Sequence, residues 1–148
     1  MSIRTQVVKE SEFQQVFLSV KQALFDYVEA VYGWDDDFQQ DRLRNDYDPV
    51  WYHWLYEKHT RIGLVCYRKK ENSLHLHLMI IFPQFQGNGM GRHAMDFLIH
   101  EARRMACDQI SLSSFTQNKR ALAFYNSLGF IIDSLEDHFI NMSLEINL

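Results

Sequence analysis

Three of the six glycines in this 148-residue chain lie within five positions, in the segment Gln86–Arg92. The segment follows an apolar stretch that ends at Phe82, and it precedes an amphipathic helical pattern. Glycine lets the backbone approach a ligand closely and adopt positive φ, while the start of a helix offers N–H groups without intrahelical acceptors and a positive dipole end. Together these properties predict a cradle for a phosphate group. The alternative is a turn that is rich in glycine and binds nothing.

Two common nucleotide-binding motifs do not describe this loop. A Walker loop requires Lys-Ser or Lys-Thr after its last glycine, whereas Gly91 is followed by an arginine and a histidine. The run Gly89–Ala94 matches Gly-x-Gly-x-x-Ala, but a dinucleotide-binding motif begins directly at the end of a strand, and residues 83–86 intervene here. Too few residues follow the loop to build a doubly wound domain.

The loop and one downstream segment resemble the GNAT superfamily of N-acetyltransferases. Gln86–Gly91 fits the family's Gln/Arg-x-x-Gly-x-Gly/Ala loop for acetyl-CoA, and Asn118–Phe130 is similar to its Asn-x-x-Ala-x-x-x-Tyr…Gly-Phe segment. Both occur in the family's order and at its spacing. The resemblance implies an α/β GNAT fold, with a mixed, mostly antiparallel and splayed central sheet flanked by helices, in a single domain over residues 1–148.

The resemblance also implies acetyl-CoA as the co-substrate and assigns binding roles by position. The backbone of Ile80 and Ile81 would pair with the pantetheine arm like an added strand, and the amide near Ile81 would stabilise the oxyanion. The diphosphate would be held by the loop residues Gln86, Gly87, Asn88, Gly89, Met90 and Gly91. Arg92 would touch a phosphate, or else be a solvated helix residue. Asn118 would contact the cofactor near the pantetheine, cap its helix, or do both.

Tyr125 is the expected general acid and also a cofactor contact. It lies seven residues after Asn118, which is two helical turns, so both side chains share one helix face. Amide formation from a thioester expels a thiolate, and a nearby phenol can protonate that sulfur or donate a hydrogen bond to it. The alternative is a core tyrosine packed with Ala121 and Leu128.

The chain departs from the resemblance at the base that accepts the amine's proton. Many family members use a glutamate on the central strand, whereas residues 75–79 read His-Leu-His-Leu-Met here. His77 is the candidate base, acting directly or through water. Alternatively, His75 and His77 simply occupy a solvated sheet face. A His-x-His pair without a third ligand is weak evidence for a metal, so we expect none.

Trp34 and Asp35 are the candidate residues for binding the amine acceptor. The acids at 35–37 could attract a cationic amine, but capping a helix start explains them fully. The aromatic residues Trp51, Tyr52 and Trp54 would line an acceptor pocket or, more simply, belong to the core.

Helices and strands that would position these residues are visible as periodic patterns. Period-3.6 patterns predict helices at 11–31, with Ser11 as N-cap, at 36–45 after a cap by Asp35, at 89–106 and at 119–128. Alternating or β-favouring runs predict strands at 3–8, 50–57, 61–68, 74–82, 109–115, 130–134 and 139–146. In the strand at 74–82 the histidines oppose three leucines, and its second half, Met79–Phe82, is expected to be fully buried.

Composition restricts the class of protein. The hydrophobic fraction of 47% excludes a disordered chain, and a net charge of −4 without a dense basic run argues against a nucleic-acid partner. No apolar run reaches the length of a membrane span, and the first ten residues lack the apolar block of a signal peptide. Cys66 and Cys107 make neither a disulfide framework nor a zinc site, which favours a cytoplasmic protein. We expect a monomer or a homodimer.

The sequence therefore predicts an N-acetyltransferase that moves the acetyl group of acetyl-CoA to a primary amine by direct attack in a ternary complex. Two alternatives stay open. One is a non-catalytic acyl-CoA-binding sensor, which the missing glutamate favours, and the other is a transferase for a longer acyl group.

Overall fold

The computed structural model describes residues 2–146, which form two compact units. The first unit comprises the residues up to Cys66 together with Leu78–Met90, and the second comprises Tyr67–His77 together with the residues from Gly91 onward. Two long strands, β3 (Thr60–Lys70) and β4 (Ser73–Ile81), each contribute residues to both units. The single domain expected over 1–148 stays a prediction.

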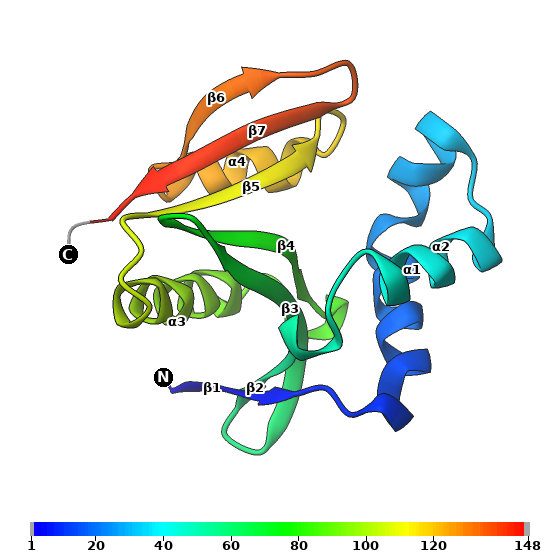
Figure 1. Cartoon of the computed structure of the whole chain (residues 1–148), viewed down its shortest axis with the longest axis horizontal. Coiled ribbons are helices and arrows are strands. Elements are labelled where there is room, and N and C mark those ends of the chain that lie inside the picture. The colour runs from blue at the N-terminus through cyan, green and yellow to red at the C-terminus, as the bar shows by residue number, and fades with distance from the viewer. Residues whose placement is uncertain (1, 147–148) are drawn as a thin grey trace. The chain divides into compact units, whose positions relative to one another are not determined.

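The strands of the described chain form a seven-stranded sheet in the order β1-β2-β3-β4-β5-β7-β6 (Figure 1). The remaining strands are β1 (Ile3–Val7), β2 (Tyr52–Glu57), β5 (Gln109–Phe115), β6 (Ile131–Leu135) and β7 (Phe139–Glu145). β4 and β5 run parallel, whereas β1–β2, β2–β3, β5–β7 and β6–β7 pair antiparallel. The mixed, mostly antiparallel sheet flanked by helices is confirmed.

In the first unit, helices α1 (Phe13–Tyr32) and α2 (Asp36–Asn45) pack with strands around one apolar core. The fully or nearly fully buried members of this core are Phe13, Val16, Phe17, Val20, Leu43, Tyr52, Trp54, Leu64, Cys66, Leu78 and Ile80. Burying each large side chain contributes roughly 1.5–3 kcal/mol of transfer free energy. Tyr52 and Trp54 therefore belong to the core, as their alternative interpretation expected.

The predicted start of α1 is wrong by two residues. Ser11 lies inside a short 3₁₀ turn, Glu10–Glu12, and α1 begins at Phe13 after Glu12, with no capping bond from the Glu12 side chain to the helix. Glu12 does not cap the helix because its carboxylate is bonded elsewhere. One oxygen accepts the backbone N–H of Lys9 at 2.9 Å and the indole N–H of Trp54 at 3.2 Å.

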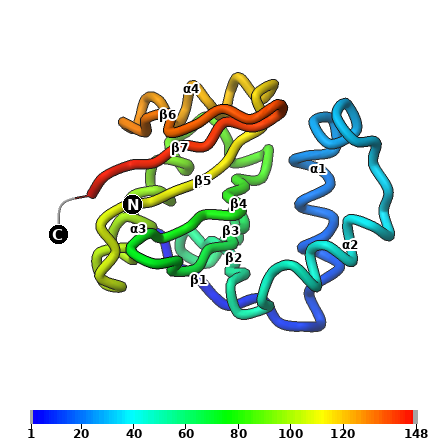
Figure 2. The backbone as a smooth tube through the Cα atoms, turned by 45° about the horizontal axis from the view of Figure 1, so that its top comes forward, coloured from blue at the N-terminus to red at the C-terminus, as the bar shows by residue number. Residues whose placement is uncertain are grey.

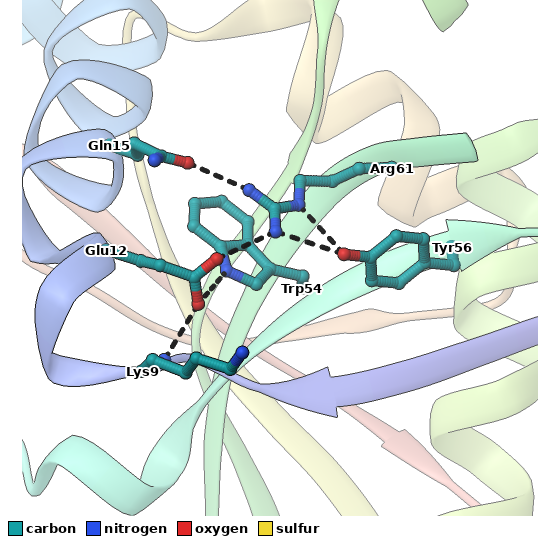
Figure 3. A network of polar contacts seen from close by, with 6 residues as sticks. All are labelled: Lys9, Glu12, Gln15, Trp54, Tyr56 and Arg61. Atoms are coloured by element: carbon teal, nitrogen blue, oxygen red, sulfur yellow. Dashed lines mark hydrogen bonds and ion pairs between the residues drawn. The ribbon is translucent and has the colours of Figure 1, made fainter. Parts of the chain in front are cut away.

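That carboxylate is the centre of a polar cluster, which we call the Glu12–Arg61 network (Figure 3). Its members are Lys9, Glu12, Gln15, Trp54, Tyr56 and Arg61. Arg61 donates to the second oxygen of Glu12 at 2.9 Å, to Gln15 at 2.9 Å and to the Tyr56 hydroxyl at 3.0 and 3.1 Å. Its guanidinium also stacks over the Trp54 ring at 4.1 Å. The network thus ties β2 and β3 to the start of α1.

In the second unit, helices α3 (Met90–Arg104, with Met90 itself in the first unit) and α4 (Lys119–Ser127) accompany the strands. The paired strands β5, β7 and β6 run beside α4 in both views of the backbone (Figures 1 and 2). β6 is the last strand of the sheet, and all five of its residues are exposed.

Candidate active site

The glycine loop lies between the end of β4 and the start of α3. After Phe82 the chain makes a short 3₁₀ turn, Pro83–Phe85, and then reaches Gly87 and Gly89, with φ of +84° and +85°. Both glycines are exposed, and a Cβ on Gly87 would have no heavy atom within 4 Å. α3 begins directly afterwards, so the N–H groups of its first turn have no acceptor within the helix. An open, positively polarised main-chain surface of this kind fits a phosphate group.

Gln86 contributes to the architecture of this loop through its side chain. Its amide nitrogen donates to the backbone carbonyl of Ile81 at 2.8 Å, which ties the start of the loop back to the last residue of β4. The Gln86 side chain is exposed. The sequence marked Gln86 and Ile81 separately as cofactor residues but gave no sign that they bond to each other, because the bond depends on the turn between them.

The third glycine of the loop has a packing role. Gly91 lies in the first turn of α3, and a Cβ there would stand 3.1 Å from the tip of the Phe124 ring on α4. A larger residue would have to push this ring away. The neighbouring Arg92 is exposed, and the structure gives no contact that separates its two interpretations.

Helix α4 and its N-cap carry the two predicted site residues Asn118 and Tyr125. Asn118 caps this helix, its side-chain oxygen accepting the N–H of Ala121 at 3.1 Å, so the capping interpretation is confirmed. Tyr125 is half-buried, with ring centroids 5.4 Å from those of both Phe124 and Phe130. Burial raises the pKa of the Tyr125 phenol to about 12, so the hydroxyl keeps its proton at neutral pH.

β4 confirms the predicted alternation and corrects one part of it. Leu74, Leu76 and Leu78 are buried, and the histidines between them are only partly buried. The same alternation continues to the end of the strand, so Met79 and Ile81 are also only partly buried. The prediction that the second half is fully buried is wrong, because a strand keeps its period of two even where both faces carry apolar residues.

The two histidines form a contact that the sequence only suggested. Their rings meet edge to face at 4.7 Å, and Nδ1 of His75 lies 2.8 Å from the Ser111 hydroxyl on β5. Burial, and then the charges of Lys70 and Arg68, lower the pKa of His75. Ser111 was missed, because only the parallel register of β4 and β5 brings it opposite His75.

The residues predicted to bind the acceptor are engaged in local contacts. Asp35 caps α2 by accepting the N–H of Phe38 at 2.9 Å, which confirms the capping interpretation. The Trp34 indole donates to Asp36 at 2.6 Å, and Lys21 pairs with the same carboxylate oxygen at 2.9 Å. The hydrogen bonds from Lys21 and then Trp34 lower the pKa of Asp36. An acceptor role for Trp34 or Asp35 stays a prediction.

Neither a membrane-spanning helix nor a metal centre is found in the described part of the chain. Over residues 2–146, no helix has both the length and the hydropathy that crossing a membrane requires. In the same part of the chain, no three or more His, Cys, Asp and Glu side chains gather in a way that would hold a metal ion.

Comparison with known proteins decides the family. The model of the acetyltransferase (GNAT) family matches residues 17–130, which include the whole glycine loop and the Asn118–Phe130 segment. The chain belongs to the acetyltransferase (GNAT) family. No curated protein matches this family member in sequence.

Solved structures share the fold of this GNAT chain at low sequence identity. An acetyltransferase from Thermus thermophilus superposes with a TM-score of 0.77 at 15% identity, covering 99% of this chain and 98% of that one. PaiA N-acetyltransferase from Thermoplasma acidophilum, in complex with coenzyme A, gives 0.75 at 12% identity, with 98% and 99% covered. The ribosomal-protein-S18-alanine N-acetyltransferase from Escherichia coli gives 0.69 at 17% identity, with 99% and 96% covered. These likenesses confirm the GNAT fold.

Proposed function

We propose that this protein is an N-acetyltransferase that transfers the acetyl group of acetyl-CoA to a primary amine in one direct step. The observation that carries the proposal is the open glycine loop after β4, in which Gly87 and Gly89 have positive φ immediately before the start of α3. Membership of the GNAT family and the coenzyme A complex of the T. acidophilum structure support the same ligand.

In this proposal main-chain groups hold most of the cofactor. The amides of the loop from Gly87 onward bind the diphosphate, and the backbone of Ile80 and Ile81 pairs with the pantetheine arm. An amide near Ile81 donates to the oxygen of the reacting carbonyl. Arg92 adds a charge near a phosphate, and Asn118 contacts the arm while it caps α4.

The chemical step needs one group that donates a proton or hydrogen bond and one group that accepts a proton. The amine nitrogen attacks the thioester carbonyl, so a C–N bond forms and the C–S bond breaks, and the sulfur leaves with the electron pair. Tyr125 donates to this sulfur, and His77 accepts the proton that the amine loses, directly or through water. Burial raises the pKa of Tyr125 to about 12, so its hydroxyl is protonated at neutral pH and can donate to the leaving sulfur.

The test combines binding with turnover. Isothermal titration measures the affinity of the protein for coenzyme A and acetyl-CoA. Release of free thiol measures the rate of acetyl transfer to each member of a panel of polyamines, amino acids, aminoglycosides and peptide amines. We expect binding together with turnover on at least one amine. Binding without turnover on any amine would instead favour the acyl-CoA sensor, whose specific support is the absence of a carboxylate at residues 75–79.

Tyr125→Phe tests the assignment of the acid. Removing a positioned acid typically costs 10²- to 10⁴-fold in rate, so we expect kcat to fall by about 100-fold with little change in acetyl-CoA affinity. Tyr67→Phe is the matched control, because burial also raises the pKa of Tyr67 to about 12 and the proposal gives it no role. With a pKa near 12, Tyr125 also predicts that turnover does not decline between pH 8 and 10 through loss of its proton. Equal turnover in the two variants would remove the acid role.

A further inference from the structure

Gly63, in the middle of β3, lies against the main chain at the end of β4. This glycine is buried, and a Cβ built on it would overlap the carbonyl oxygen of Ile80. The same Cβ would stand only 3.1 Å from the Ile80 carbonyl carbon and 3.3 Å from the Ile81 Cα. These neighbours are backbone atoms, which cannot rotate aside like the tip of a side chain. Any other residue at position 63 would therefore displace the backbone of Ile80 and Ile81.

This close approach shows that the end of β4 departs from a regular ladder. In a regular sheet the Cβ atoms point out of the pleat, while the carbonyls point along the hydrogen bonds between strands. Here, instead, the Ile80 carbonyl oxygen occupies the space in which a side chain at position 63 would begin. A glycine in a strand interior commonly marks such a bulge or close backbone approach.

Two hydrogen bonds hold the chain directly after this departure. The N–H of Phe82 donates to the Ile62 carbonyl at 2.9 Å, and the Gln86 side chain donates to the Ile81 carbonyl at 2.8 Å. Gly63, both bonds and the start of the glycine loop all belong to the first unit. The course of the main chain from Ile80 to Gln86 is thus set by contacts that surround it.

We infer that Gly63 is a positioning residue for the acyl-CoA arm. By carrying no side chain, it allows the Ile80–Ile81 main chain to take the course on which the pantetheine and the thioester dock. The inference rests on the proposed function, which assigns this stretch to the cofactor. Gly63 would act through the backbone of β4 and would touch no ligand itself.

The test compares the binding of whole coenzyme A with the binding of its nucleotide half alone. Calorimetry measures the affinity of Gly63→Ala for coenzyme A and for adenosine 3′-phosphate 5′-diphosphate, the nucleotide half, which reaches the loop but lacks the pantetheine arm. We expect coenzyme A to bind at least tenfold more weakly than to the wild type and the nucleotide half to bind within about twofold. A purely structural role would not produce this difference.

Gly33→Ala is the matched control. It makes the same chemical change in the same unit, at a glycine with a φ of +77° and no heavy atom within 4 Å of an added Cβ. It therefore adds backbone strain without touching β4, and we expect both affinities to stay within twofold of the wild type. Equal weakening of the two ligands in Gly63→Ala, or no weakening, would overturn the inference.

A second measurement covers the case in which Gly63→Ala does not fold. In the wild type, the backbone amide resonances of Gly63, Ile80 and Ile81 should shift on addition of coenzyme A and stay in place with the nucleotide half. Unchanged resonances with bound coenzyme A would overturn the inference and leave the proposed function intact. A wild type that binds no coenzyme A would instead refute the proposed function itself.

Discussion

The Glu12–Arg61 network and the loop glycines Gly87 and Gly89 lie in the first unit, yet the two regions use polar groups in opposite ways. In the network, the Glu12 carboxylate and the Arg61 guanidinium pair at 2.9 Å, and their other hydrogen bonds, at 2.9–3.2 Å, go mostly to neutral side chains (Figure 3). In the loop, exposed glycines present the main chain to solvent. Polar groups satisfied within the protein stabilise the fold, whereas a main chain left open can bind a ligand. The dense hydrogen bonding of the network therefore indicates a structural role, whereas the open main chain of the loop fits the proposed binding role.

The largest effect is expected from a substitution that obstructs the glycine loop. In Gly89→Val a β-branched residue would have to adopt a φ of about +85°, which is strongly disfavoured, and its side chain would obstruct the approach of a diphosphate. We expect the affinity for coenzyme A to fall by about 100-fold, or roughly 2.7 kcal/mol, as measured by calorimetry. Unchanged affinity in a folded variant would remove the loop from the binding site.

The network should show the reverse behaviour. Glu12→Gln keeps the shape of the side chain but places an amide where a carboxylate accepts from Arg61 and Trp54. Because hydrogen bonds to charged groups contribute about 1.5–3 kcal/mol, we expect the free energy of unfolding to fall by about 2 kcal/mol in urea titrations. The affinity of the variant for coenzyme A serves as the control and should stay within twofold. A large loss of affinity at unchanged stability would contradict the distinction between the two regions.

The pH dependence of stability should report on the same carboxylate. The backbone N–H of Lys9 above all, followed by Arg61 and Trp54, lowers the pKa of Glu12 below its ordinary value of 4.5. A lowered pKa in the folded state stabilises the protein above the unfolded pKa, and this contribution is lost as the pH falls through the folded value. Wild type should therefore lose more stability than Glu12→Gln between pH 5 and pH 3. Parallel losses would show that Glu12 is not the group that titrates.

The smallest effect is expected at the ion pair of Lys21 with Asp36. Its side chains are 36% and 52% exposed, and solvent screening leaves exposed pairs with little effect on stability. Lys21→Met should therefore change the melting temperature by only a few degrees, as measured by calorimetry. Addition of 1 M salt to the wild type is the control, since it screens the same pair. A larger change would mean that Lys21 is needed to hold Trp34 and Asp36 in place.

Local patterns predicted most of the fold correctly. The strand at Gln109–Phe115, the caps by Asp35 and Asn118 and the glycine turn before α3 each depend on residues within a few positions of one another. Two of the errors arose where a distant partner intervened or a local rule was extended too far. Ser11 does not cap α1 because the helix starts later, beside a Glu12 side chain held by Trp54 and by Arg61, 49 positions away. Met79 and Ile81 stay partly buried because the alternation of β4 persists.

Some features of the candidate site also follow from local sequence, whereas others depend on the tertiary structure. Its glycines, its helix start and the tyrosine two turns after Asn118 follow from residue types at short spacing, which is why the family could be inferred before the fold. The Ser111 contact of His75, 36 positions apart, the bond between Gln86 and Ile81 and the fit of Gly63 under Ile80 depend on strand register and on the turn after β4. Short-range sterics and capping are encoded in neighbouring residues, whereas register is set only when the buried faces of several strands pack at once. The amino-acid order therefore determined which groups are available, and the tertiary structure decided how the main chain presents them.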